Sequence, residues 1–219
     1  MNKTLFLGVV SAALAPFAIQ NSATAITLGF TTPTPATVEV GQQFDIGIAI
    51  SGLGDSSAPS LGGFDFNVNF DSSILSFDSA AFGDPILGSQ LDLDPDGFEL
   101  INFADDFLSS LGTVNLFELS GDSDIVLDSS QPDSFTLAVL TFNAIAPGNS
   151  DLEISFDGIG SSLSDALGNP LDLSTVNIND SSIEIEPGVT TSVPESPTAI
   201  ALLTLGLFGL RTKLVKKAK

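Results

Sequence analysis

The sequence predicts an all-β protein, a single antiparallel sandwich of about nine strands. Apolar and polar residues alternate with a period of two in several short runs, and Gly, Pro, Asp, Asn and Ser separate these runs. No stretch of this middle part has the pattern of a helix of any length. An N-terminal signal peptide and a C-terminal apolar helix are expected to flank the sandwich.

The clearest predicted strand is residues 63–70, where Phe64, Phe66, Val68 and Phe70 fall on one face. In chain order the predicted strands are residues 26–30, 37–40, 44–50, 63–70, 98–103, 113–119, 135–144, 152–156, 176–178 and 183–185. Residues 135–144 are nearly continuous in apolar residues, which is typical of a central strand covered on both faces. All 17 aromatic residues are Phe, which needs no hydroxyl partner, so they are expected in the core.

The first 25 residues have the features of a secretory signal peptide. Lys3 supplies a positive charge, residues 5–19 are almost wholly apolar, and Ala23 and Ala25 are small residues of the kind that precede a cleavage site. A buried N-terminal helix is the alternative, but Pro16 would interrupt it. The mature, exported chain is therefore expected to begin near Ile26.

The composition excludes most kinds of catalysis. The chain has no Cys and no His, and it has neither Lys nor Arg between Lys3 and Arg211. Disulfides, thiolate sites and Ser-His or Ser-Lys nucleophiles are therefore ruled out in the middle part. All 27 acidic residues lie between those two bases. Because this negative field repels polyanions, nucleic acid is excluded as a partner.

The C-terminal part has three sections: a polar segment, an apolar stretch and a basic tail. An apolar helix over residues 199–210 would rise ~18 Å, short of the ~30 Å of a hydrocarbon core. The basic residues of 211–219 favour a cytoplasmic position for the tail. The predicted division is a signal peptide at 1–25, a sandwich at 26–187, a linker at 188–198, an apolar helix at 199–210 and a tail at 211–219.

Residues 193–219 resemble a PEP-CTERM sorting signal, the C-terminal tag that exosortase-type enzymes of Gram-negative bacteria are thought to process. Val193, Pro194, Glu195 and Pro197 carry the resemblance, although Ser196 occupies the family's second proline position. The resemblance implies export to the cell envelope, the cell surface or an extracellular matrix, with transient anchoring in the inner membrane. A plain membrane tail is the alternative interpretation.

The middle part resembles the cohesin family from about Ile26 to Glu186. The resemblance rests on a strand, Gly turn and strand in residues 38–44, on residues 63–71 leading into Ile74 and Leu75, and on residues 137–142 leading to 146–148. In the family the second motif has Tyr where this chain has Phe70. The resemblance implies a nine-stranded jelly-roll sandwich. Cohesins of cellulosomes bind dockerin modules, so a dockerin-like protein is one expected partner.

Asp92, Asp94 and Asp96, followed by Gly97, have the D-x-D-x-D-G spacing of the start of a calcium loop. Glu99 completes the candidate ligand set for Ca²⁺. The motif is incomplete, because Phe103 stands where the last ligand of an EF-hand loop would be and Pro95 stiffens the loop. A solvated acidic loop between two strands is the simpler interpretation.

Three functions remain open from the sequence alone. The first is an exported, non-enzymatic adhesive, scaffolding or matrix component. The second is a calcium-dependent module that binds an extracellular polysaccharide or a dockerin-like partner; the absence of Trp and Tyr counts against sugar stacking. The third is a glycosidase that works with two carboxylates alone. With so many acidic residues, two carboxylates at a suitable distance are expected by chance, so such a pair is not evidence for this activity.

Overall fold

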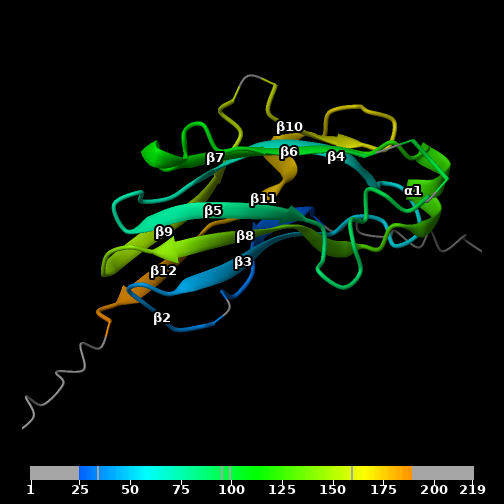
Figure 1. Cartoon of the computed structure of the whole chain (residues 1–219). Helices are drawn as coiled ribbons and strands as arrows, with labels where there is room; N and C mark the ends of the chain where they lie inside the picture. The colour runs from blue at the N-terminus through cyan, green and yellow to red at the C-terminus, as the bar shows by residue number, and fades with distance from the viewer. Residues whose placement is uncertain (1–24, 34, 95, 99, 159, 189–219) are drawn as a thin grey trace, which may run out of the picture.

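The computed structural model describes residues 25–188, except residues 34, 95, 99 and 159. They form a β-sandwich of two sheets (Figure 1). The five-stranded sheet has the order β11-β1-β3-β8-β5. Its strands are β1 (Thr27–Phe30), β3 (Gln43–Ser51), β5 (Leu75–Phe82), β8 (Ser134–Ala144) and β11 (Asn177–Asn179).

The seven-stranded sheet has the order β2-β12-β9-β4-β7-β6, and β10 pairs with β4 beside this path. Its strands are β2 (Val38–Glu39), β4 (Leu61–Asn69), β6 (Ile101–Asp105), β7 (Thr113–Leu119), β9 (Gly148–Ser155), β10 (Ser162–Asp165) and β12 (Ser181–Glu186). Two 3₁₀ turns (Ser109–Leu111 and Leu173–Thr175) and the helix α1 (Asp124–Ser130) complete the described elements.

The core lies between the inner faces of the two sheets. As predicted, the alternating apolar residues of the strands form this core: Phe64, Phe66 and Val68 of β4 are all buried. Phe142 of β8 is central, with its ring in contact with the rings of Phe44, Phe70 and Phe77 at centroid distances of 5.1–5.8 Å. The described cluster runs from Leu28 to Ile185. Residues 25–188 therefore contain a complete core and fold as one unit.

The sheets are mixed, so the predicted wholly antiparallel arrangement is wrong in two places. β1 pairs with β11 in parallel, and β12 pairs with β2 in parallel. Both pairs join a strand near the start of the described chain to one near its end. A parallel pair needs a long connection, and here nearly the whole domain supplies it.

Two strands and a helix were not predicted. β5 has the sequence LSFDSAAF and a bulge between Phe77 and Ser79, so its alternation is broken. β10 has four residues only. The helix α1 has seven residues; the Ser123 hydroxyl caps it by accepting from the Val126 N–H, and Leu127 is its buried side chain.

The strand at residues 135–144 is central, as predicted, but not covered on both faces. β8 lies between β3 and β5, and its buried residues include Leu140, Phe142 and Ala144 while Thr141 and Asn143 are only half-buried. Within the described residues no helix is both long and apolar enough to cross a membrane. Residues 1–24 of the predicted signal peptide and residues 189–219 of the predicted linker, helix and tail lie outside the described residues.

Candidate functional site

The outer face of the seven-stranded sheet carries a polar network that crosses β4 and β7. In β4 the side chains of Asp65, Asn67 and Asn69 alternate with the buried Phe64, Phe66 and Val68. The Asn115 amide of β7 donates to Asp65 Oδ1 at 2.8 Å and to Asn67 Oδ1 at 3.1 Å. The Thr113 hydroxyl donates to Asn69 Oδ1 at 3.0 Å. These hydrogen bonds hold the outward-facing side chains of β4 and β7 in position against each other.

The network continues onto β9 and the loop after it. The Asn69 amide donates to Ser155 Oγ at 3.0 Å, and the Asn67 amide donates to Asp157 Oδ1 at 2.8 Å. The Ser155 hydroxyl, and after it the Asn67 amide, lowers the pKa of Asp157, so this carboxylate is charged at neutral pH. We call this network the polar ladder; its members are Asp65, Asn67, Asn69, Thr113, Asn115, Ser155 and Asp157.

An exposed apolar cluster lies beside the polar ladder on β6 and β7. Ile101 faces Leu119 and Phe103 faces Phe117 across the two strands, and the two Phe rings stack with centroids 5.0 Å apart. Ile101 is 57% exposed and Phe103 is 50% exposed. We call these four residues the edge patch. β6 ends the strand order of its sheet, so its outer edge lies open.

Further apolar side chains extend the edge patch into the neighbouring loops. Phe98 and Phe107, on either side of β6, are each 84% exposed, and Leu111 is 77% exposed. Monomeric proteins rarely leave a contiguous apolar surface of this kind on an open sheet edge unless it binds something. Together, the edge patch and the polar ladder form an apolar contact region beside rigid amide and carboxylate groups.

Acidic residues border the other end of this face. A hollow of ≈ 290 Å³ lies where β4 and β9 meet, and it is lined by Asn69, Phe70, Asp71, Asn149, Asp151 and Glu153. The hydroxyl and the backbone N–H of Ser73 lower the pKa of Asp71. A partner that covers the whole face therefore meets negative charge at this end and apolar side chains at the other.

Glu118 occupies the inner side of β7, directly between Phe117 and Leu119 of the edge patch. Its side chain is fully buried, and Ser89 Oγ donates to its Oε1 at 2.9 Å. Burial raises the pKa of Glu118 to about 7; Ser89 and Asn102 oppose this shift, and the charge of Asp92 adds to it. Glu118 is not among the site residues predicted from the sequence, although the alternation of Val114, Leu116 and Glu118 places it on the buried face.

The predicted calcium residues lie in the loop between β5 and β6. Asp94 Oδ1 accepts from the Asp96 N–H at 3.0 Å, and the Gly97 N–H donates to the Asp94 carbonyl at 2.9 Å. Among the described residues no three acidic side chains come together in a position to hold a metal ion. Glu99 lies outside the described residues, so the set of Asp92, Asp94, Asp96 and Glu99 stays a prediction. The predicted signal-cleavage residue Ala23 and the sorting-motif residues Val193, Pro194, Glu195 and Pro197 also lie outside.

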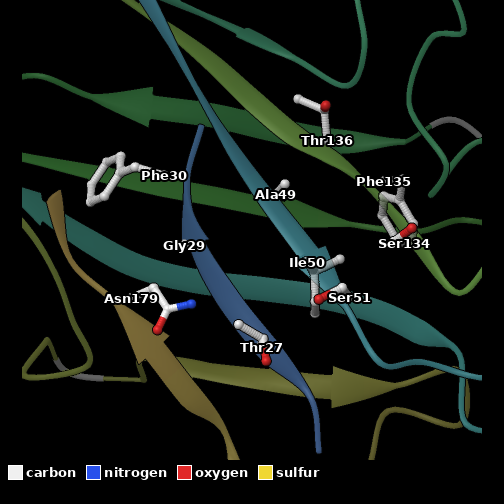
Figure 2. A pocket seen from close by; sticks show the side chains of 10 residues that line it. All are labelled: Thr27, Gly29, Phe30, Ala49, Ile50, Ser51, Ser134, Phe135, Thr136 and Asn179. Atoms are coloured by element: carbon white, nitrogen blue, oxygen red, sulfur yellow. The ribbon is translucent and has the colours of Figure 1, made fainter. Parts of the chain in front are cut away.

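A second hollow lies on the five-stranded sheet. Figure 2 shows this groove of ≈ 370 Å³ crossing β11, β1, β3 and β8. Gly29 and Ala49 leave it open because they have little or no side chain, and Phe30 and Phe135 lie toward its opposite ends (Figure 2). Its polar lining consists of hydroxyl and amide groups from Thr27, Ser51, Ser134, Thr136 and Asn179. No charged residue lines it.

No protein-family model matches the sequence, and no curated protein does. Solved structures match the fold. The second type II cohesin module of the adaptor scaffoldin ScaA of Acetivibrio cellulolyticus has a TM-score of 0.54 and 19% identity, and covers 81% of this chain and 98% of the module. The third cohesin of ScaC from the same organism, solved in complex with the ScaB dockerin, has a TM-score of 0.53 and 13% identity, over 74% of this chain and 99% of its own.

A third structure, the Coh-OlpC-Doc435 cohesin–dockerin complex of Clostridium thermocellum, has a TM-score of 0.52 and 14% identity. It covers 81% of this chain and 99% of its own. Identities this low support a statement about the fold alone. The described residues of this chain have a cohesin-like β-sandwich fold.

Proposed function

We propose that this protein is an exported, non-enzymatic binding module that holds a protein partner on the outer face of its seven-stranded sheet. The observation that carries the proposal is the edge patch: the exposed Phe103 stacks on the half-buried Phe117 at an open sheet edge beside the polar ladder. Such rigid aromatic contacts surrounded by polar groups are typical of protein interfaces.

The partner proposed is a dockerin-like segment. Two of the similar solved structures are cohesins in complex with dockerins, and the fold likeness brings this class of partner to the present chain. The described residues contain no Lys, Arg or His, so any positive charge in the interface has to come from the partner. A dockerin-like segment with basic residues around an apolar face fits both the apolar edge patch and the acidic residues at the other end of this sheet face.

The experiment is a capture assay with residues 25–188 and the host's extracellular fraction, followed by a titration with each purified captured protein. The double substitution F103A/F117A is expected to weaken binding by at least about tenfold, since central aromatic contacts each contribute about 2 kcal/mol or more. T141A, on the opposite sheet, is the matched control and should bind as the wild type does. Equal binding by F103A/F117A and the wild type would refute this site.

A second candidate function, binding of a neutral polysaccharide, is favoured by the groove on the five-stranded sheet. Its lining offers hydroxyls and an amide and carries no charge, which suits the hydroxyl groups of an uncharged sugar chain. Affinity electrophoresis in gels containing neutral polysaccharides tests it. Substitution of Asn179 by Asp, which places a negative charge in the groove, should abolish any retardation, whereas F103A/F117A should leave it unchanged.

The export route is part of the same proposal. Cleavage after Ala25 by signal peptidase and processing at the tag of residues 193–219 by an exosortase-type enzyme would place the domain at the cell envelope, the cell surface or in the extracellular matrix. A transient stage in the inner membrane would precede the second step. Mass spectrometry of the intact protein from the host tests both steps, because each cleavage defines one new terminus.

A further inference from the structure

Four strands of the described residues end the strand order of a sheet, and three of them are poorly suited to pair with a further strand. β11 has three residues and β2 has two. β5 has a register shift between Phe77 and Ser79 and carries the exposed Asp78 at that point. The free side of β10 is occupied, because the Leu171 N–H donates to the Leu163 carbonyl at 2.8 Å. Short length, a bulge, a charge and a covering segment are means by which proteins keep a sheet edge from pairing.

The fourth strand, β6, has none of these features along its first four residues. It pairs with β7 in unbroken register from Ile101 opposite Leu119 to Asp105 opposite Asn115, and its charged residue is the last one. In an antiparallel pair, alternate residues direct both their N–H and their C=O groups away from the partner strand. Among the described strands β6 pairs with β7 alone, so its outer edge can accept another strand.

The side chains of β6 favour an added strand with apolar residues at every second position. Ile101 and Phe103 are exposed, and the Phe103 ring is held by stacking on Phe117. Apolar side chains placed directly beside Ile101 and Phe103 on the next strand would form cross-strand pairs with them. The edge patch would then continue onto the added strand and be shielded from water by it.

Charge decides what kind of chain this strand comes from. Asp105 and Asp106 are exposed at one end of β6, and Asp92 and Asp96 are exposed in the loop that precedes it. The described residues contain no Lys, Arg or His. A second copy of this domain would bring the same negative charges to the edge and be repelled, whereas a strand with basic residues at both ends would be attracted.

We propose that β6 accepts an extended segment of another protein as an additional strand of the seven-stranded sheet. The segment carries apolar residues at alternate positions and Lys or Arg on both sides of them. Backbone hydrogen bonds hold it in register, and the pairing of its apolar side chains with Ile101 and Phe103 selects its sequence. This mode of contact rests on the proposed docking function and specifies how the partner reaches the edge patch.

The first test uses the acetylated and amidated peptide Lys-Val-Thr-Val-Thr-Val-Lys as a model of such a segment, titrated into ¹⁵N-labelled residues 25–188 and followed by NMR. The amide signals of β6 should shift and saturate, and their hydrogen exchange should slow, while those of β5 stay unchanged. Two further peptides are N-methylated, one on the Val residues and one on the Thr residues. One of them should bind at least about tenfold more weakly and the other as the unmodified peptide does, since one set of N–H groups faces β6.

Equal binding by both N-methylated peptides would overturn strand addition, and so would absence of binding by the unmodified peptide. A dimer of the wild type that excludes the peptide would also overturn it, because the edge would then be occupied by a second copy. The capture assay with F103A/F117A tests docking separately. A captured partner that leaves the exchange of the β6 amides unchanged would refute strand addition while the docking face stands.

The second test places a positive charge on one edge strand at a time. I101K should weaken binding of the unmodified peptide by about tenfold or more, through repulsion of its Lys residues and loss of an apolar contact. A81K is the matched control, since Ala81 is exposed on β5, and it should bind as the wild type does. Both substitutions lie at exposed positions, so both variants are expected to fold, which thermal unfolding verifies. Loss of binding in A81K with I101K unaffected would overturn the assignment to β6.

Discussion

Glu118 is the residue whose ionisation matters most for folding. Its pKa is raised to about 7 by burial, so the folded protein holds a proton on this carboxyl at pH values where the unfolded chain has released it. Between the ordinary pKa of 4.5 and about 7, the folded state binds more protons than the unfolded state. The free energy of unfolding therefore falls as the pH rises through this window, and it stays at the lower level above it.

We expect the Glu118 carboxyl to contribute a loss of about 3 kcal/mol in stability from pH 4.5 to pH 7 in the absence of Ca²⁺. E118Q should lack this part of the pH dependence and should be more stable than the wild type at pH 8. Urea unfolding in EDTA across this pH range measures the difference between the two proteins. Parallel curves for wild type and E118Q would show that Glu118 does not titrate in this window.

At the scale of elements, the turn that leads into β7 fixes both the edge patch and Glu118 in register. Gly112 ends the 3₁₀ turn Ser109–Leu111 with φ of 88°, in the left-handed region. A Cβ at this position would collide with the Phe70 carbonyl oxygen, and the Phe70 N–H donates to the Gly112 carbonyl at 2.8 Å. Only glycine accommodates both the backbone conformation and the close approach.

We expect G112A to destabilise the domain by about 2 to 3 kcal/mol, from backbone strain together with the collision. G41A is the control: Gly41 has φ of 91° but open space around its Cβ position, so only the conformational cost of about 1 kcal/mol applies. Denaturant unfolding of the two variants separates these contributions. Equal losses would mean that the contact with Phe70 relaxes without cost.

The sequence predicts those elements whose side chains alternate without interruption. β3, β4 and β7 were found because apolar side chains recur at every second position along most of each strand. β5 was missed since its bulge shifts the alternation, and the two parallel pairs were missed because strand direction depends on contacts between distant segments. Periodicity shows which face is buried, but it does not show which strand lies beside which.

The candidate site was less predictable than the fold for the same reason. The edge patch needs β6 and β7 to be neighbours, and the polar ladder needs β4, β7 and β9 side by side. The acidic spacing of Asp92, Asp94 and Asp96 lies in the loop between β5 and β6, whereas the buried carboxylate of Glu118 comes from β7. The pairing of Asn102 with Glu118 and the hydrogen bond from Ser89 to Glu118 connect β7 to β6 and to this loop, and neither contact shows in the sequence.

At the scale of the whole molecule, charge of one sign opposes folding throughout the domain. The described residues contain no base, so ion pairs are absent there and every interaction between charged side chains is repulsive. Folding brings these charges closer together and raises the repulsion, whereas dissolved ions screen it. The stability of this domain should therefore depend on ionic strength more than that of a domain with mixed charges.

We expect the unfolding temperature of residues 25–188 to rise when NaCl is increased from about 0.02 M to 0.5 M in EDTA, because the Debye length falls several-fold over this range. Differential scanning calorimetry measures the change. KCl should have the same effect as NaCl, since screening does not depend on the identity of the cation. An unfolding temperature independent of salt would contradict the argument from net charge.

The same absence of Lys and Arg determines which proteases can cleave the domain. Enzymes that cleave after basic residues have no site between Lys3 and Arg211, whether the chain is folded or unfolded. Enzymes that cleave after aromatic residues find Phe98 and Phe107, both 84% exposed and both outside the strands. The sheet edge that carries the apolar contact surface therefore also carries exposed cleavage sites for these proteases. A bound partner would cover the apolar surface and the cleavage sites together.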